Sequence, residues 1–221
     1  MPYYPMMVQL RQKRCLVVGG GQIAERKIGS LLAAGADDVT VVSPSVTDTI
    51  LTWCHSGKTV VHLRSFEPAD VQDAVIVIAA TNDSAVNLAV HDACLPHQWI
   101  NIVDRPDLCS FTVPSVVERG DLQIAISTGG HNPGLSKKLR RQLEQWIGPE
   151  YEAYTRFLGE MRRQVLALDL NETDKRSILS ELLSERFLHW TKTGETECRD
   201  QEAAALLNKK RPRVYKMYPI E

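Results

Sequence analysis

The chain has 221 residues, of which 43% are hydrophobic and 24% charged, and its formal net charge is −1. This is the balance of an ordinary globular protein, and a charge so near zero gives no general attraction to nucleic acid or to an acidic membrane surface. The five cysteines are scattered and form no C-x-x-C pair, which excludes a zinc knuckle and indicates reduced thiols. With no signal-like start and no membrane-length apolar run, we expect a cytoplasmic protein.

A run of three glycines stands between the first predicted strand, residues 15–18, and a predicted helix over residues 22–34. Gly19 and Gly21 occupy the first two glycine positions of the dinucleotide fingerprint G-x-G-x-x-G/A, and Ala24 occupies the third. The amide groups of such a turn and the positive end of the helix dipole face a pyrophosphate. A glycine-rich turn without a ligand is the alternative, but the flanking strand and helix favour a dinucleotide site formed by Gly19, Gly20, Gly21, Gln22 and Ile23.

The second predicted strand, residues 38–42, leads to the position that meets the adenosine ribose. An acid here usually binds the ribose of NAD, and a nearby arginine accommodates the phosphate of NADP. This chain has Ser43, Pro44 and Ser45 instead, and the next lysine or arginine is Lys58. Because a buried phosphate without a cation is costly, we expect NAD, with Ser43, Pro44 and the backbone taking the place of the acid.

Three more strands are predicted over residues 59–63, 74–80 and 99–103, which gives a doubly wound parallel sheet in the first ~110 residues. Thr81 and Asn82 follow the fourth strand, at the edge where open α/β sheets bind ligands. Asp83 is a candidate cap for a helix that runs to about residue 95. Asp104 closes the fifth strand at that same edge.

The pattern changes after Asp104. Strands are predicted over residues 111–118 and 122–127, joined by the turn Arg119-Gly120-Asp121. Asn132 and Pro133 begin a helix that ends at Gly148-Pro149. The remainder is predicted to be helical, over residues 150–168, 173–190 and 201–208. We interpret the basic run at residues 209–213 as a solvated end, because nothing else in the chain supports nucleic-acid binding.

The chain resembles precorrin-2 dehydrogenases, the NAD-dependent enzymes of sirohaem synthesis. The resemblance lies in YPMMVQL, VVGGGQIAERK, AATNDSAVN and NIVDRPDLCSFTVPSVVERGDLQIAISTGGHNPGLSKKLR, which together cover about residues 3–148 in the family's order. It implies an N-terminal Rossmann-type domain over residues 1–112, a small α+β dimerisation region over residues 113–148 and a helical C-terminal domain over residues 149–221. It also implies a homodimer.

The resemblance implies oxidation of the tetrapyrrole precorrin-2 to sirohydrochlorin, with hydride passing to NAD⁺. Asp104 matches the family's proposed catalytic aspartate and would act as the base; the alternative is that it caps a turn before Pro106. A chelatase activity that inserts Fe²⁺ is a second hypothesis, with His131 and Asp104 as the candidate metal residues. A third hypothesis is a non-catalytic module that senses NAD.

Precorrin-2 carries eight carboxylates, so its site should offer fixed donors and cations. The glycine loop at the start of the helix that begins at Pro133 is the expected cradle, formed by Ser127, Thr128, Gly129, Gly130, His131 and Asn132. Some members of this family are fused to a uroporphyrinogen methyltransferase. Thr128 stands where those fused members have a second serine, so a role specific to that serine does not carry over directly. The helix that follows bears four cations, which either meet the substrate or form a solvated face: Lys137, Lys138, Arg140 and Arg141.

Overall fold

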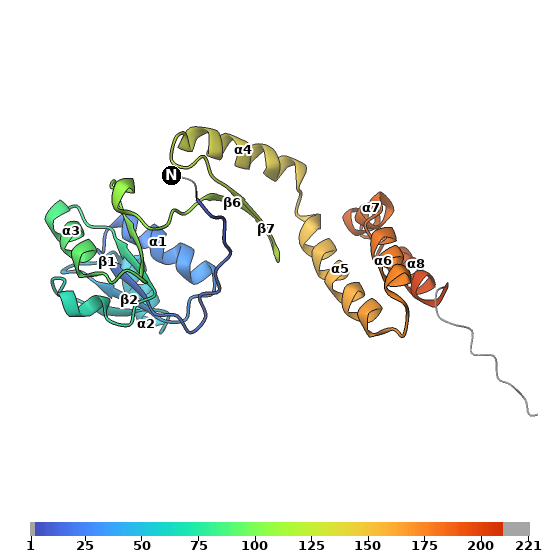
Figure 1. Cartoon of the computed structure of the whole chain (residues 1–221), viewed down its shortest axis with the longest axis horizontal. Coiled ribbons are helices and arrows are strands. Elements are labelled where there is room, and N and C mark those ends of the chain that lie inside the picture. The colour runs from blue at the N-terminus through green and yellow to red at the C-terminus, as the bar shows by residue number, and fades with distance from the viewer. Residues whose placement is uncertain (1–2, 210–221) are drawn as a thin grey trace, which may run out of the picture. The chain divides into compact units, whose positions relative to one another are not determined.

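A computed structural model describes residues 3–209 of the chain (Figure 1). The chain divides into two compact units, Met1–Val113 and Pro114–Glu221, and each is described here by itself. Residues 210–213 of the basic run lie outside the described residues. The division of the second unit into a dimerisation region and a helical domain stays a prediction.

The first unit is a five-stranded parallel sheet in the order β3-β2-β1-β4-β5, which confirms the predicted Rossmann-type domain. The strand order reverses between β1 and β4, and this switch point is where open α/β sheets bind ligands. The strands are β1 (Cys15–Val18), β2 (Val39–Val42), β3 (Val60–His62), β4 (Ile76–Ala79) and β5 (Trp99–Ile102).

Helices connect these strands. They are α1 (Gln22–Ala33), α2 (Asp48–His55) and α3 (Ser84–Ala93), with two 3-10 turns, η1 (Pro68–Val71) and η2 (Pro106–Leu108). Helix α2 was not predicted from the sequence. It begins at the N-cap Thr47, whose hydroxyl accepts a hydrogen bond from the backbone N–H of Ile50 at 3.4 Å. The predicted cap of α3 is confirmed, since Asp83 accepts from the N–H groups of Ala85 and Val86.

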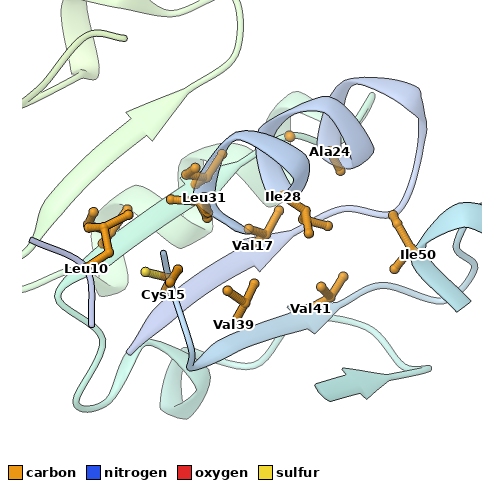
Figure 2. Packing of buried hydrophobic residues seen from close by; sticks show 13 residues of the cluster. Leu10, Cys15, Val17, Ala24, Ile28, Leu31, Val39, Val41 and Ile50 are labelled. Atoms are coloured by element: carbon orange, nitrogen blue, oxygen red, sulfur yellow. The ribbon is translucent and has the colours of Figure 1, made fainter. Parts of the chain in front are cut away.

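Alternate side chains of each strand face opposite layers of the core. Cys15 and Val17 of β1 belong to the same buried cluster as Ile28 of α1, shown in Figure 2. Leu16 and Val18 point to the other face, where Val90 of α3 packs against them. A sheet buried on both faces explains why its strands read as continuous apolar runs, and it holds their carboxyl ends in fixed positions.

The second unit begins with an antiparallel hairpin, β6 (Ser115–Arg119) and β7 (Leu122–Ile126), followed by α4 (Pro133–Trp146). The hairpin pairs with no other strand in the described part of the chain. Arg119 fastens it to the end of α4, because its guanidinium donates to the backbone oxygens of Ile147 at 3.0 Å and Glu144 at 3.2 Å. These contacts satisfy carbonyl groups that the end of a helix leaves without partners.

Four helices complete the unit: α5 (Glu150–Ala167), α6 (Glu172–Glu181), α7 (Glu185–Thr193) and α8 (Thr196–Lys209). They enclose a separate core that includes Tyr154, Phe157 and Phe187. The prediction of one helix over residues 173–190 was wrong, because the chain breaks at the N-cap Ser184. The tyrosine hydroxyl of Tyr154 donates to the backbone oxygen of Leu182 at 2.9 Å, so a tertiary contact uses a carbonyl at the break. Of the helices described, none is long and apolar enough to cross a membrane.

Candidate cofactor and catalytic site

The glycine turn between β1 and α1 is shaped by two close backbone approaches. A Cβ atom at Gly19 would lie 2.3 Å from the carbonyl oxygen of Ala80, and the φ of Gly19 is +121°. A Cβ atom at Gly20 would lie 2.0 Å from the carbonyl oxygen of Ser45. Both positions therefore require glycine, and the turn is held against the chain segments that follow β4 and β2.

Gly21 differs from its two neighbours because it opens on free space. A Cβ atom there would meet nothing within 4 Å. Gly21 is also the N-cap of α1, and no side chain accepts from the first amide groups of this helix. Gln22 and Ile23 are exposed beside it. Open space in front of an uncapped helix N-terminus fits the pyrophosphate of a dinucleotide.

The segment after β2 has the neutral character that the sequence suggested. Ser43 is buried, and its backbone N–H donates to the carbonyl oxygen of His62 at 3.1 Å, which ties the segment to β3. Pro44 and Ser45 are exposed. The backbone N–H of Thr47 then donates to the carbonyl oxygen of Gly20 at 3.0 Å, so this segment and the glycine turn form one surface.

A buried asparagine organises the turn between β4 and α3. The side chain of Asn87 accepts from the N–H of Thr81 at 3.2 Å and from its hydroxyl at 2.9 Å, and it donates to the carbonyl oxygen of Thr81 at 3.0 Å. Thr81 lies beside Gly19, and Asn82 next to it is exposed. Asn87 was not predicted from the sequence; the signal was a polar residue at a helix position that faces the sheet.

Asp104 has an unusual backbone conformation at the carboxyl end of the sheet. Its φ is +62°, in the left-handed region that few residues other than glycine adopt, although aspartate and asparagine tolerate it best. The N-cap of η2 is Arg105, and no side chain caps that turn. The carboxylate of Asp104 is exposed and makes no hydrogen bond to any residue within 3–209. The structure therefore gives no support to the turn-capping alternative.

Beneath this edge, a lysine lies on the face of α1 that packs against the sheet. The Lys27 amine donates to the side-chain oxygen of Asn101 at 3.0 Å, and the Asn101 amide donates to the carbonyl oxygen of Phe111 at 3.1 Å. Burial, reinforced by the neighbouring charge of Arg26, lowers the pKa of Lys27. Neither Lys27 nor Asn101 was a candidate site residue in the sequence analysis. Two signals were nevertheless present: a lysine three residues after Ala24 on the apolar face of the helix, and an asparagine within a buried strand.

The glycine loop of the second unit is held together by Thr128. The Thr128 hydroxyl accepts from the N–H of Asn132 at 3.1 Å and from the hydroxyl of buried Ser136 at 3.3 Å. Asn132 caps α4 as predicted, accepting from the N–H of Leu135 at 2.9 Å. The N–H of Gly129 donates to the Ser127 hydroxyl, and that of His131 to the Thr128 carbonyl. The loop is therefore ordered by its own contacts and leaves fewer free amide groups than the sequence suggested.

Most side chains around this loop are exposed. Gly130 has a φ of +85° and opens on free space, since a Cβ atom there would meet nothing within 4 Å, and His131 is exposed beside it. On α4, Arg140 forms an ion pair with Glu144, while the other three cations of this helix, Lys137, Lys138 and Arg141, are exposed. Within residues 3–209, no three histidine, cysteine, aspartate or glutamate side chains come together in a way that would hold a metal ion.

Three family models match consecutive parts of the chain. A putative NAD(P)-binding model matches residues 6–115, a model of the central part of a sirohaem biosynthesis protein matches residues 119–145, and a SirC C-terminal domain model matches residues 151–192.

Relatives with known names agree with these matches. A siroheme synthase of Methylobacillus flagellatus is 45% identical over 73% of this chain and 34% of its own length. One from Nitrosomonas europaea is 36% identical over 94% of this chain and 43% of its own length, so the chain spans less than half of these relatives. The solved structure of SirC, precorrin-2 dehydrogenase, superposes with a TM-score of 0.79 at 30% identity, covering 94% of this chain and all of that one. The chain therefore belongs to the precorrin-2 dehydrogenase and sirohaem synthase family.

Proposed function

We propose that this protein is an NAD-dependent dehydrogenase that oxidises precorrin-2 to sirohydrochlorin in sirohaem biosynthesis. The observation that carries the proposal is the match to a precorrin-2 dehydrogenase over the whole of that protein's chain. The geometry of the sheet edge supports it, because a dinucleotide cradle and an unpaired carboxylate both follow carboxyl ends of the same parallel sheet.

The residues of the first unit fit a bound dinucleotide. The space in front of Gly21 receives the pyrophosphate, the amide groups of Gln22 and Ile23 face it, and Ser43 and Pro44 lie at the ribose end. Thr81 and Asn82 flank the turn from the β4 side. Bound NAD⁺ would supply the hydride acceptor. We expect NAD rather than NADP, since neither lysine nor arginine occurs between Val42 and Lys58.

Asp104 is the proposed base. Oxidation of the macrocycle removes a hydride from one carbon and a proton from another, and the carboxylate takes the proton. Asp104 suits this task because its side chain is exposed at the ligand-binding edge and is not occupied by a hydrogen bond within residues 3–209. A strained backbone conformation at such a position is typical of a residue that is held for function.

The second unit supplies candidate contacts for the carboxylates of the substrate. The loop formed by residues 127–132 is proposed to bind the macrocycle's acidic side chains, with the exposed cations of α4 next in sequence. The structure assigns the Thr128 hydroxyl to loop order, so we expect Thr128 to act by shaping the loop. His131 is exposed and stays a candidate for substrate contact.

The protein is also proposed to be a cytoplasmic homodimer. All five cysteines are free, as expected in a reducing compartment. Helix α4 exposes apolar side chains that a partner would cover, among them Leu135 and Trp146. The hairpin β6–β7 is a two-stranded sheet, which is marginally stable without further packing. An identical subunit that interlocks with this region would cover the apolar side chains of α4 and would stabilise the hairpin by further packing.

Turnover distinguishes this function from its rivals. Purified protein is mixed with precorrin-2 and NAD⁺, and sirohydrochlorin and NADH are followed by absorbance. We expect catalytic turnover that depends on NAD⁺; NAD⁺ binding without turnover would favour a sensing module. A second assay tests for chelatase activity: the protein is mixed with sirohydrochlorin and Fe²⁺ without NAD⁺, and metal insertion is followed by absorbance. Protein-dependent, saturable metal insertion that His131→Ala abolishes would establish the chelatase activity, for which the described residues offer no metal cluster.

A further inference from the structure

The acid that usually follows β2 in an NAD site is missing from the sequence, yet in the structure an acid of α1 contacts the segment that follows β2, residues 43–47. The hydroxyl of Thr47, in the segment after β2, donates to the side-chain oxygen Oε2 of Glu25 at 2.6 Å. Glu25 lies in the first turn of α1, whose N-cap is Gly21. A carboxylate is therefore present beside the segment that meets the adenosine ribose, although it comes from another element.

The position of this carboxylate is fixed by backbone contacts on both sides. The N–H of Glu25 donates to the carbonyl oxygen of Gly21 at 2.9 Å, and the N–H of Thr47 donates to the carbonyl oxygen of Gly20 at 3.0 Å. The close approach of Gly20 to Ser45 locks the two segments together. Thr47 is further fixed as the N-cap of α2. Glu25 is thus held where the glycine turn, residues 19–21, meets the segment after β2, residues 43–47.

The charge of Glu25 is not neutralised there. Within residues 3–209, Glu25 forms no ion pair, and its second oxygen, Oε1, has no hydrogen-bond partner. The first charged residue after β2 is Asp48, another acid, at the start of α2. A ribose hydroxyl can donate to a free carboxylate oxygen, whereas a 2′-phosphate would bring about two negative charges against it.

We propose that Glu25 is the residue that selects NAD over NADP, with Thr47 as the residue that positions it. The carboxylate accepts from the ribose hydroxyl of NAD and repels the phosphate of NADP. This inference rests on the proposed NAD-dependent function. It adds a charged group to the ribose end of the site, where the sequence analysis found only the uncharged residues Ser43, Pro44 and Ser45. It also explains how an incomplete fingerprint can still discriminate between the two cofactors.

The test compares both cofactors in two assays, binding by calorimetry and turnover with precorrin-2. Glu25→Gln keeps an acceptor for Thr47 and removes the charge, so the ratio of kcat/KM for NAD⁺ over NADP⁺ should fall by about tenfold or more, mainly through better use of NADP⁺. Glu25→Lys should bring the preference to NADP⁺. Asp73→Asn removes one charge from an exposed residue before β4, at the opposite edge of the sheet, and should leave the ratio unchanged.

The role of Thr47 has its own pair of variants. Thr47→Ser keeps the hydroxyl and should keep the cofactor preference, while Thr47→Val frees Glu25 and should lower it. Discrimination by the wild-type protein should also weaken as salt is raised, because salt screens the repulsion. These measurements need no catalytic variant and are informative even if Glu25→Gln proves unstable.

An unchanged NAD⁺ to NADP⁺ ratio in Glu25→Gln and Glu25→Lys, with both variants folded, would overturn the proposal. Equal affinity of the wild-type protein for the two cofactors would overturn it as well. Failure of the proposed function looks different, since turnover would then be absent with either cofactor while calorimetry still reports the binding preference. Absence of all dinucleotide binding would overturn both.

Discussion

Two aspartates of the first unit adopt the same left-handed conformation, and they serve as an internal comparison. Asp73, before β4, and Asp104, after β5, both have a φ of +62°. They lie at opposite edges of the parallel sheet, because one precedes a strand and the other follows one. Each conformation costs on the order of 1 kcal/mol relative to an unstrained residue. Of the two, Asp104 stands at the carboxyl edge, where open α/β sheets bind ligands, so its strain fits the proposed catalytic role.

Gly21 gives the sharpest prediction for a single residue. Gly21→Asp should fold normally, because the position opens on free space and aspartate is a favourable N-cap for α1. The new carboxylate would occupy the place of the pyrophosphate, so the Kd for NAD⁺ should rise by about 100-fold or more. Calorimetry gives the affinity, and thermal unfolding should show a Tm equal to that of the wild type or higher.

Gly21→Asn is the matched control for this prediction, since it caps the helix without adding charge. Its loss of affinity should be clearly smaller than that of Gly21→Asp. Tight NAD⁺ binding by Gly21→Asp would mean that this turn does not hold the phosphates.

The individual residues also show where sequence reasoning ends. Gly19, Gly21 and Asp104 became candidates because they occupy fixed places relative to strands, which the sequence predicts well. Lys27, Asn87 and Glu25 were not candidates, because each is singled out by a hydrogen bond to a residue 74, 6 or 22 positions away, respectively. Such pairings are set by the tertiary structure and leave only a weak trace in the sequence, a polar residue at an unexpected position.

At the scale of elements, the turn between β4 and α3 depends on Asn87. Asn87→Leu removes three hydrogen bonds from Thr81, and the turn that contacts Gly19 should lose its fixed shape. We expect the Kd for NAD⁺ to rise by about tenfold and the free energy of unfolding to fall by about 2 kcal/mol. Asn87→Asp keeps the two acceptor contacts and should be intermediate. Calorimetry and urea unfolding measure the two effects.

A second variant separates positioning from general stability. Val90 is fully buried in the same helix, so Val90→Ala should cost a similar free energy of unfolding without changing the turn. Its affinity for NAD⁺ should equal that of the wild type. If Val90→Ala weakens binding as much as Asn87→Leu does, the asparagine acts only through stability.

The elements themselves were predicted where their periodicity is strong and missed where a contact decides. The five parallel strands, the hairpin and α4 appear close to the expected residues. Helix α2 was missed because only eight residues form it and Thr47 is its main signal. The break at Ser184 was missed because no glycine or proline marks it; packing around Leu182 decides it instead. The sequence pattern of residues 173–190 alone is equally consistent with one long helix.

At the scale of the whole molecule, the exposed apolar face of α4 indicates an interface with another subunit. Three apolar side chains of this helix are exposed: Leu135 to 44%, Leu139 to 38% and Trp146 to 74%. The helix packs against the hairpin β6–β7, and Arg119 of β6 donates a hydrogen bond to the end of α4. Surfaces of this kind on one amphipathic helix are typical of an interface between subunits. The proposed homodimer would bury them.

Leu139→Glu should convert the dimer into a monomer at micromolar concentration, because it places a charge at the centre of the proposed interface. Sedimentation velocity gives the mass directly. Leu183→Glu is the matched control, since Leu183 is 65% exposed after α6 and lies outside the proposed interface. It should remain dimeric. A wild-type protein that sediments as a monomer would contradict the proposal.

Dehydrogenation is proposed to occur at the carboxyl edge of the parallel sheet, with Asp104 as the base. The most direct test measures NADH formation from precorrin-2 at saturating NAD⁺ in two variants, Asp104→Gly and Asp73→Gly. Glycine suits a φ of +62°, so both variants should be at least as stable as the wild type. We expect Asp104→Gly to lose about 100-fold or more in kcat with NAD⁺ affinity retained, while Asp73→Gly keeps the wild-type rate. A wild-type kcat in Asp104→Gly would contradict the role of Asp104 as the base.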